Sequence, residues 1–138
     1  MISERDSGKS LEGRIADDYL SFLVGEIHTV VAATVDDCGL PVTCAIDVMD
    51  FDNTGLYFLT AKGKCFYRRL KKKPFISITG IKDNDTLSSI AVSLRGNVEE
   101  LGEDALIRLI QKNKYMTKIY PTEESRKALC IQDFSGKW

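Results

Sequence analysis

One stretch, residues 57–70, carries residue types that together could bind a phosphate group. It reads YFLTAKGKCFYRRL: an apolar segment that predicts a strand ends in Thr60, a turn containing Gly63 follows, and Lys64 opens a predicted helix. A hydroxyl, an ammonium group and free helix N–H groups can together meet a phosphate monoester, and the helix dipole adds about 0.3–1 kcal/mol. The alternative is that the basic residues of 62–73 form a solvated helix face.

The other motifs that could carry chemistry are weak. The segment 7–10, SGKS, ends like a P-loop, but the first glycine of that motif would fall at Ser3 and no predicted strand precedes it. His28 is the only histidine, which disfavours a multi-histidine metal site and a Ser-His-Asp triad. The cysteines lack metal-ligand spacing and are expected to act as small apolar side chains. They are Cys38, Cys44, Cys65 and Cys130. We expect no metal site and assign no catalytic residue.

Length and composition indicate one globular domain. The chain has 138 residues, 43% hydrophobic and 28% charged, so residues 1–138 are expected to share one core, with residues 1–11 as a mobile polar lead-in. The 19 basic and 20 acidic residues leave a net charge of -1, which gives no general attraction to nucleic acid or membranes. The sequence contains neither a signal peptide nor an apolar stretch long enough to span a bilayer, so we expect a cytoplasmic protein.

The pattern of apolar residues predicts a mainly β fold with helices outside it. We expect strands over residues 29–35, 41–49, 56–60, 75–79 and 90–101. Helices are expected over residues 12–24, 63–73, 104–112 and 122–129, with Gly25 ending the first and Pro74 the second. The first three strands follow one another with only turns between them, which predicts an antiparallel meander. Such an order is typical of a small barrel covered by helices, whereas a doubly wound parallel sheet needs alternating strands and helices.

Three segments carry a resemblance to a known family. They read HTVVAATVDDCGLPVTCAIDVM, LYFLTAKGKCFYRRLKKKPFISI and AVSLRGNVEEL, and a predicted helix precedes the first. Together they resemble the pyridoxamine 5'-phosphate oxidase-like FMN-binding split barrels, especially the small bacterial members grouped with nitroimidazole-resistance and general-stress flavoproteins. The resemblance covers about residues 15–126. It implies a six-stranded antiparallel split β-barrel of Greek-key type flanked by helices.

The resemblance also implies where a flavin would bind. In the family, the FMN phosphate is held at the end of the third strand and the start of the next helix, which corresponds here to Thr60, Lys62 and Lys64. Lys64 is the strongest candidate. The isoalloxazine ring lies along the second strand, which corresponds to residues Val42, Thr43, Cys44 and Ala45, whose backbone groups can bond the ring. Arg95, in the R-G-x-V strand, is a further cofactor-binding candidate, although an exposed strand position or an interface ion pair would also explain it.

From this resemblance we expect an FMN-dependent oxidoreductase that acts on an unidentified small molecule as a homodimer, with NADH or NADPH as the candidate electron donor. The alternative is a flavin-binding module without turnover, acting as a store, sensor or carrier. Heme or a deazaflavin remains open as the ligand, and His28 as an axial ligand of heme. Oxidation of pyridoxamine 5'-phosphate is not expected, because after Leu129 the chain offers only Lys137 as a basic group to hold that substrate. A basic-helix nucleic-acid binder is disfavoured by the balanced charge of the rest of the chain.

Overall fold

The computed structural model describes residues 11–82, 89–112 and 126–137. The expected lead-in therefore lies almost wholly outside the described residues. The elements run in the order α1 (Leu11–Phe22), η2 (Leu23–Ile27), β1 (Thr29–Val35), β2 (Pro41–Phe51), β3 (Leu56–Ala61), α2 (Cys65–Lys72), β4 (Phe75–Lys82), β5 (Ile90–Glu100), α3 (Glu103–Lys112) and β6 (Arg126–Lys137). None of the described helices is both long and apolar enough to cross a membrane.

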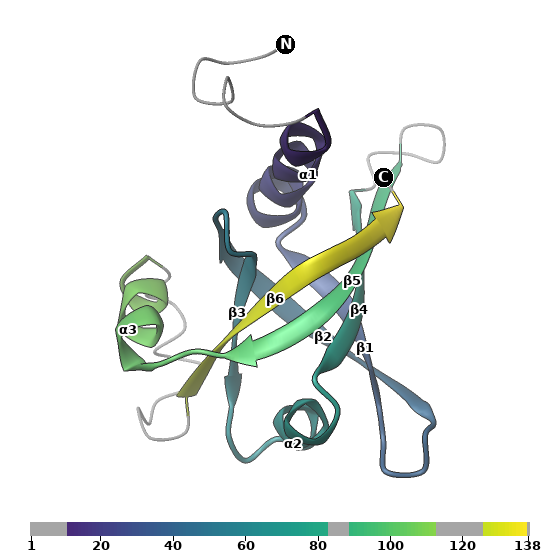
Figure 1. The fold of residues 1–138 in the computed structure, drawn as a ribbon, viewed down its shortest axis with the longest axis vertical. Coiled ribbons are helices and arrows are strands. Elements are labelled where there is room, and N and C mark those ends of the chain that lie inside the picture. Colours follow the sequence, from purple (N-terminus) through teal and green to yellow (C-terminus); the bar gives the residue numbers. More distant parts are fainter. Residues whose placement is uncertain (1–10, 83–88, 113–125, 138) are drawn as a thin grey trace.

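The strands form a closed antiparallel barrel in the order β1-β2-β3-β6-β5-β4 (Figure 1). The predicted meander of the first three strands is confirmed, since β1 pairs with β2 and β2 pairs with β3. The chain then crosses to the other side of β1, where β4 pairs, and β6 closes the barrel between β3 and β5. The expected fold class, a six-stranded split barrel with flanking helices, is therefore confirmed.

The prediction of a helix over residues 122–129 is wrong for residues 126–129, the part that the structure describes. From Arg126 onward the chain is strand β6, paired with β3 on one edge and with β5 on the other. Leu129 and Ile131 point into the barrel, while Ala128 and Cys130 point outward beneath α3. A strand buried on both faces loses the alternation of apolar and polar residues that identifies a strand in a sequence. Barrel closure therefore overrides the local helical preference of this segment.

The helices close the barrel at its ends and on one side. In Figure 1, α1 lies at one end of the barrel and α2 at the other. Helix α2 buries Phe66, Tyr67 and Leu70 in the main core, where the Phe66 and Phe58 rings lie 5.9 Å apart. Helix α3 buries Leu109 against the outward side chains of β3 and β6. The apolar side of α2 thus fixes the position of its first turn relative to the end of β3.

The first helix does not stop at Gly25 as expected. The chain continues through the π-helical turn η2 as far as Ile27, and the His28 N–H donates to the Leu23 carbonyl at 2.6 Å. His28 ends the turn with a φ of 68°, a backbone conformation that residues other than glycine rarely adopt. Leu23 at the start of this turn is fully buried, and Ile27 at its end packs against the main core, so core packing accounts for the turn beyond Gly25.

Candidate functional site

Two clefts flank the hairpin formed by β1 and β2. The two strands pair with each other throughout residues 29–35 and 41–47, but β1 pairs with β4 only over residues 31–33. On the other side, β2 pairs with β3 only from Val48 onward. The tip half of the hairpin therefore has open edges on both sides. A cleft lies along each edge, and we name them the α2 cleft, beside β2, and the Arg95 cleft, beside β1.

The α2 cleft has a volume of about 340 Å³ and brings together residues that are far apart in the sequence. Strand β2 supplies Cys44, Ala45, Ile46 and Asp47, β3 supplies Leu59 and Thr60, α2 and its N-cap supply Lys64, Cys65, Phe66 and Arg69, and Thr29 completes the lining. Four of the predicted cofactor-binding residues, Cys44, Ala45, Thr60 and Lys64, are thus neighbours in one cleft.

The remaining predicted residues lie elsewhere. Val42 and Thr43 continue along the same strand of the hairpin but are not among the residues that line the α2 cleft. Lys62 lies exposed between β3 and α2, also outside the lining. Arg95 lines the other cleft, across the hairpin. A single copy of the chain therefore does not place Arg95 with the other candidates.

The start of α2 presents donors to the cleft. Lys64 is the N-cap residue, with extended backbone angles, and its N–H donates to the Ala61 carbonyl at 3.1 Å. Its side chain does not cap the helix, and the first turn of α2 contains no acidic residue. The first N–H groups of a helix have no partner within the helix and carry partial positive charge. An anion at this end of α2 would meet both these N–H groups and the Lys64 ammonium.

Arg69 is a cleft residue that the sequence analysis missed. Its Nε donates to the Oγ1 of the buried Thr34 at 2.7 Å, which holds the guanidinium near the tip of the hairpin. A signal for it existed, because Cys65 and Arg69 are four residues apart and therefore share one face of α2. The cleft thus contains a second cation beside Lys64.

The electrostatics around Cys44 reflect both burial and these cations. Burial raises the pKa of the Cys44 thiol, and the nearby charges of Arg69 and Lys64 act in the opposite direction without cancelling the effect. The thiol is therefore neutral at ordinary pH. Asp47 is the only carboxylate among the lining residues, and it accepts a hydrogen bond from the Thr29 hydroxyl at 2.7 Å.

The basic residues at the end of α2 and at its C-cap, Lys73, hold the helix to its neighbours. Lys71 pairs with Glu100 at 2.9 Å, Lys72 pairs with Asp37 at 3.0 Å, and the Lys73 Nζ donates to the Asp36 carbonyl at 3.0 Å. Tyr67 also donates to Glu100 at 2.7 Å. These contacts assign the far end of α2 a structural role, in contrast to its first turn at the cleft.

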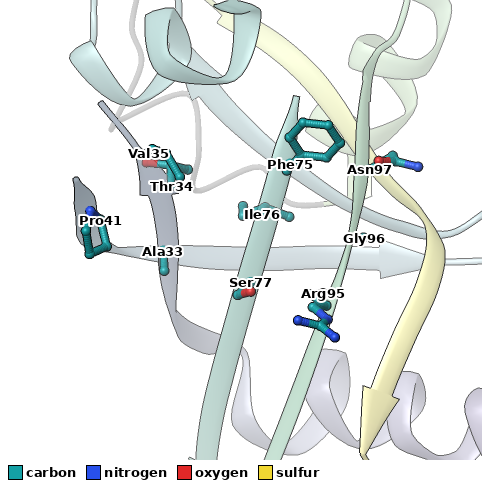
Figure 2. A pocket seen from close by; sticks show the side chains of 10 residues that line it. All are labelled: Ala33, Thr34, Val35, Pro41, Phe75, Ile76, Ser77, Arg95, Gly96 and Asn97. Carbon is teal, nitrogen blue, oxygen red and sulfur yellow. The ribbon is translucent and has the colours of Figure 1, made fainter. Parts of the chain in front are cut away.

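The Arg95 cleft, shown in Figure 2, lies where β1 and β4 separate, and its volume is about 440 Å³. Its lining is Ala33, Thr34, Val35 and Pro41 from the hairpin, Phe75, Ile76 and Ser77 from β4, and Arg95, Gly96 and Asn97 from β5. Thr34 lines this cleft and also accepts the hydrogen bond from Arg69 of the α2 cleft. One side-chain contact therefore connects the two clefts.

Comparison with known sequences identifies the family. A family model described as pyridoxamine 5'-phosphate oxidase matches residues 16–132, most of the chain. The chain belongs to this family. The comparison with curated proteins found no match. Family membership agrees with the resemblance on which the candidate cofactor residues were chosen.

Solved structures share the fold at low sequence identity. A NimC/NimA family protein from Clostridium acetobutylicum superposes with a TM-score of 0.73 at 16% identity, covering 87% of this chain and 84% of that one. HutZ, the heme storage protein from Vibrio cholerae, gives 0.66 at 16% identity, covering 90% of each chain. A protein of unknown function from Agrobacterium tumefaciens gives 0.70 at 20% identity, and this chain, 99% covered, spans 58% of its length. These likenesses establish the fold of the chain.

Proposed function

We propose that the α2 cleft binds FMN, with the phosphate at the start of α2 and the isoalloxazine ring along the open edge of β2. The observation that carries this proposal is that one cleft is lined by candidates from two separate segments of the sequence. Cys44 and Ala45 come from one segment, and Thr60 and Lys64 come from the other. The barrel creates this cleft, because β2 and β3 pair only from Val48 onward and leave the earlier part of β2 open.

The residues of the cleft fit the two ends of FMN. A phosphate dianion would meet the Lys64 ammonium, the Arg69 guanidinium and the first N–H groups of α2, a combination of charge and directed donors suited to phosphate. The flavin ring needs hydrogen bonds to its polar edge and apolar contact on its faces. Backbone groups along the open edge of β2 and the side chains of Ile46 and Ala45 could supply them.

In this proposal the protein is an FMN-dependent oxidoreductase that acts on an unidentified small molecule, with a reduced nicotinamide as the electron donor. FMN supplies the redox chemistry, so the chain needs to bind and orient the flavin and admit a partner. One observation favours the alternative of a flavin store or carrier: the cleft lining contains no histidine, and its one carboxylate is hydrogen-bonded to Thr29. A protein without turnover would need no acid or base there.

We further propose that two copies associate through the outer face of β2, β1, β4 and β5. The register of these strands places Ala45 beside Val31, Val31 beside Thr79, and Thr79 beside Ser93, so an uncharged belt crosses four strands. Val31 is 52% exposed, and Ile81 and Phe75 on the same face are each 60% exposed. A second copy would bury this face and shield a ring lying on β2, which one small barrel cannot enclose.

The dimer is tested by sedimentation at micromolar concentration. Val31→Glu should yield monomers, because it places a charge in an interface expected to bury more than about 1,000 Å². Ile107→Glu on α3 is the matched control, since Ile107 is equally exposed at 52% but lies outside this face. A wild-type monomer that retains FMN would refute the dimer.

The ligand itself is tested on protein purified without added cofactor. An absorption spectrum and mass determination of the copurifying molecule should reveal FMN. Heme or a deazaflavin would refute the FMN assignment while leaving a cofactor-binding barrel. Reduction by NADH or NADPH, followed as loss of the yellow colour, separates an oxidoreductase from a store that no donor reduces.

Lys64→Ala tests the phosphate position. A charge-assisted hydrogen bond contributes about 1.5–3 kcal/mol, so the dissociation constant of FMN should rise about tenfold or more while that of riboflavin changes little. Lys72→Ala, which removes a lysine of the same helix outside the cleft, should leave both unchanged. Equal weakening of FMN and riboflavin by Lys64→Ala would show that Lys64 does not contact the phosphate.

In this proposal the protein does not oxidise pyridoxamine 5'-phosphate. Its own phosphate would need a second anion site positioned against the flavin. Steady-state turnover with oxygen on FMN-saturated protein should be negligible. A rate near 1 s⁻¹ would contradict this expectation, because ordinary enzymes work at about 1–10³ s⁻¹.

A further inference from the structure

We propose that a pocket beside α3 binds a small α-amino acid with an apolar side chain. This pocket, which we name the α3 pocket, has a volume of about 230 Å³. Its lining comes from the end of β2, the turn that follows it, the start of β3, and α3. The residues are Asp50, Asp52, Tyr57, Ala105, Arg108, Leu109, Gln111 and Lys112. None of them lines the α2 cleft or the Arg95 cleft, so the site is distinct from the proposed flavin site.

The α3 pocket lies away from the face proposed for the dimer. That face uses the part of β2 that pairs with β1, residues 41–47. The pocket uses the part of β2 after Val48, which pairs with β3 on the opposite edge of the strand. Helix α3 packs on the outward side chains of β3 and β6, and Figure 1 shows it on the β3 side of the barrel. Association of two copies through β1 and β4 therefore leaves the pocket open.

Asp52 supplies a negative charge in a fixed position. The Thr54 and Gly55 N–H groups donate to its Oδ1 at 2.7 and 3.3 Å, and the Tyr57 hydroxyl lies 2.7 Å from both carboxylate oxygens. Burial acts to raise the pKa of Asp52, but these hydrogen bonds outweigh it and hold the pKa below its ordinary value of 3.8. Both backbone donors are on Oδ1, so Oδ2 retains the capacity to accept a hydrogen bond from an ammonium group.

Arg108 supplies the positive charge. It shares one face of α3 with Ala105 and Lys112, which lie three residues before it and four after it. Its side chain is exposed, and within the part of the chain that the structure describes it makes no hydrogen bond or ion pair. A guanidinium presents parallel N–H donors that match a carboxylate in a two-point contact. Arg108 is therefore available to hold the carboxylate of a ligand.

The other two charged residues of the lining neutralise each other. Lys112 pairs with Asp50 at 2.8 Å. One carboxylate, Asp52, and one guanidinium, Arg108, are left to meet a ligand. A ligand with a single charge would match only one of them, whereas an α-amino acid carries an ammonium group for Asp52 and a carboxylate for Arg108.

The rest of the pocket is apolar and small. Leu109 and Tyr57 are buried in the cluster beneath α3, and Ala105 lies one helical turn before Leu109. These side chains offer an apolar surface beside the two charges. Pockets for drug-sized ligands measure about 300–1,000 Å³, so a volume below that range suits a ligand as small as an amino acid.

The test is a titration of flavin-free, isotope-labelled protein with L-leucine, followed by amide NMR shifts. We expect saturable shifts confined to residues 50–57 and 105–112. Two analogues each lack one charged group: L-leucinamide has no carboxylate, and 4-methylpentanoate has no ammonium group. Each should bind at least about tenfold more weakly than L-leucine. No saturable shift, shifts elsewhere in the protein, or equal binding of either analogue would overturn the proposal.

Variants assign the two charges to their residues. Arg108→Gln should weaken L-leucine about tenfold or more and abolish its advantage over L-leucinamide. Asp52→Asn keeps an oxygen for the turn and should abolish the advantage of L-leucine over 4-methylpentanoate. Arg68→Gln, at an exposed arginine of α2 outside the pocket, is the control and should bind normally. Unchanged binding of L-leucine in Arg108→Gln would overturn the proposal.

A competition experiment separates this site from the proposed flavin site. FMN is added to the sample with L-leucine and read at residues 44–47 and 64–69. Saturating FMN should leave the affinity for L-leucine unchanged, because the two sites share no lining residue. Val31→Glu should also bind L-leucine normally, since Val31 lies on the face proposed for the dimer. Displacement of L-leucine by FMN, or its loss in Val31→Glu, would overturn the assignment to the α3 pocket.

Discussion

The two clefts beside the β1–β2 hairpin differ in how the fold creates them. The α2 cleft forms where a strand end meets a helix start, and its cations, Lys64 and Arg69, lie on that helix. The Arg95 cleft forms where two strands stop pairing, and its one cation stands on a strand beside a bulge. The first arrangement offers a phosphate both charge and helix N–H groups, whereas the second offers a single planar cation next to an aromatic ring. The same hairpin thus borders two clefts that differ in their charged groups.

The largest expected effect concerns the backbone beneath the Arg95 cleft. Gly96→Ala should destabilise the protein by about 1–3 kcal/mol or more, because its Cβ would lie 2.4 Å from the Gln132 carbonyl oxygen and force β6 away. Gly63→Ala, beside the α2 cleft, is the matched control, since no atom lies within 4 Å of its Cβ. It should change stability by less than about 0.5 kcal/mol. Urea unfolding measures both, and equal stabilities would show that β6 can yield at Gly96.

The next largest effect is expected from breaking the hydrogen bond between Arg69 and Thr34, which connects the two clefts. Thr34→Val removes the acceptor of the Arg69 hydrogen bond and should cost about 1–2 kcal/mol of stability. It should also weaken FMN, though less than Lys64→Ala does, because Arg69 remains charged but loses its orientation. Thr54→Val, at an exposed position between β2 and β3 outside the α2 cleft, serves as the control for FMN affinity. FMN affinity that is unaffected by Thr34→Val would indicate that Arg69 does not take part in binding.

Cysteine labelling tests ligand binding in the α2 cleft, with a smaller expected effect. Cys65 is exposed and lines the α2 cleft, whereas the exposed Cys38 lies in the hairpin turn outside it. FMN should slow iodoacetamide labelling of Cys65 several-fold and leave the labelling of Cys38 unchanged. Peptide mass spectrometry gives each rate. Unchanged labelling of Cys65 in the presence of saturating FMN would contradict binding in the α2 cleft.

The smallest effect is the pH dependence of the helix that carries the α2 cleft. Burial acts to raise the pKa of Glu100, but hydrogen bonds from Lys71 and Tyr67 outweigh it and hold the pKa below its ordinary value of 4.5. A carboxyl group with a lowered pKa stabilises the fold above the pKa of the unfolded chain, and this contribution disappears as the pH falls through the folded-state pKa. Stability should therefore decline below about pH 4.5, and Glu100→Gln should flatten that decline. Glu99→Gln, on the same strand, controls for the loss of a negative charge. If Glu100→Gln leaves the decline in stability at acid pH unchanged, the contacts of Glu100 with Lys71 and Tyr67 are not its source.

Much of the fold was predictable because its signals are local. The first three strands are separated by turns rich in Asp, Asn and Gly, and Pro74 follows the second predicted helix, so their positions agree with the structure within a few residues. Strand β6 was not predictable in this way. Residues 128–131 are buried on both faces, and the evidence that they form a strand is their pairing with β3 and β5, which are distant in the sequence.

For the sites, the sequence by itself determined the chemistry that each segment can offer: a hydroxyl and a lysine at a strand-to-helix junction, and an arginine within a strand. Only the tertiary structure decided which of these meet. Barrel closure places Thr60 and Lys64 beside Cys44 and Ala45, and it places Arg95 across the hairpin with Phe75. It also brings Arg69 to Thr34, a contact between residues that are 35 positions apart. The physical reason is that clefts arise where strand pairing ends, and pairing depends on the register of all six strands of the barrel rather than on any one segment.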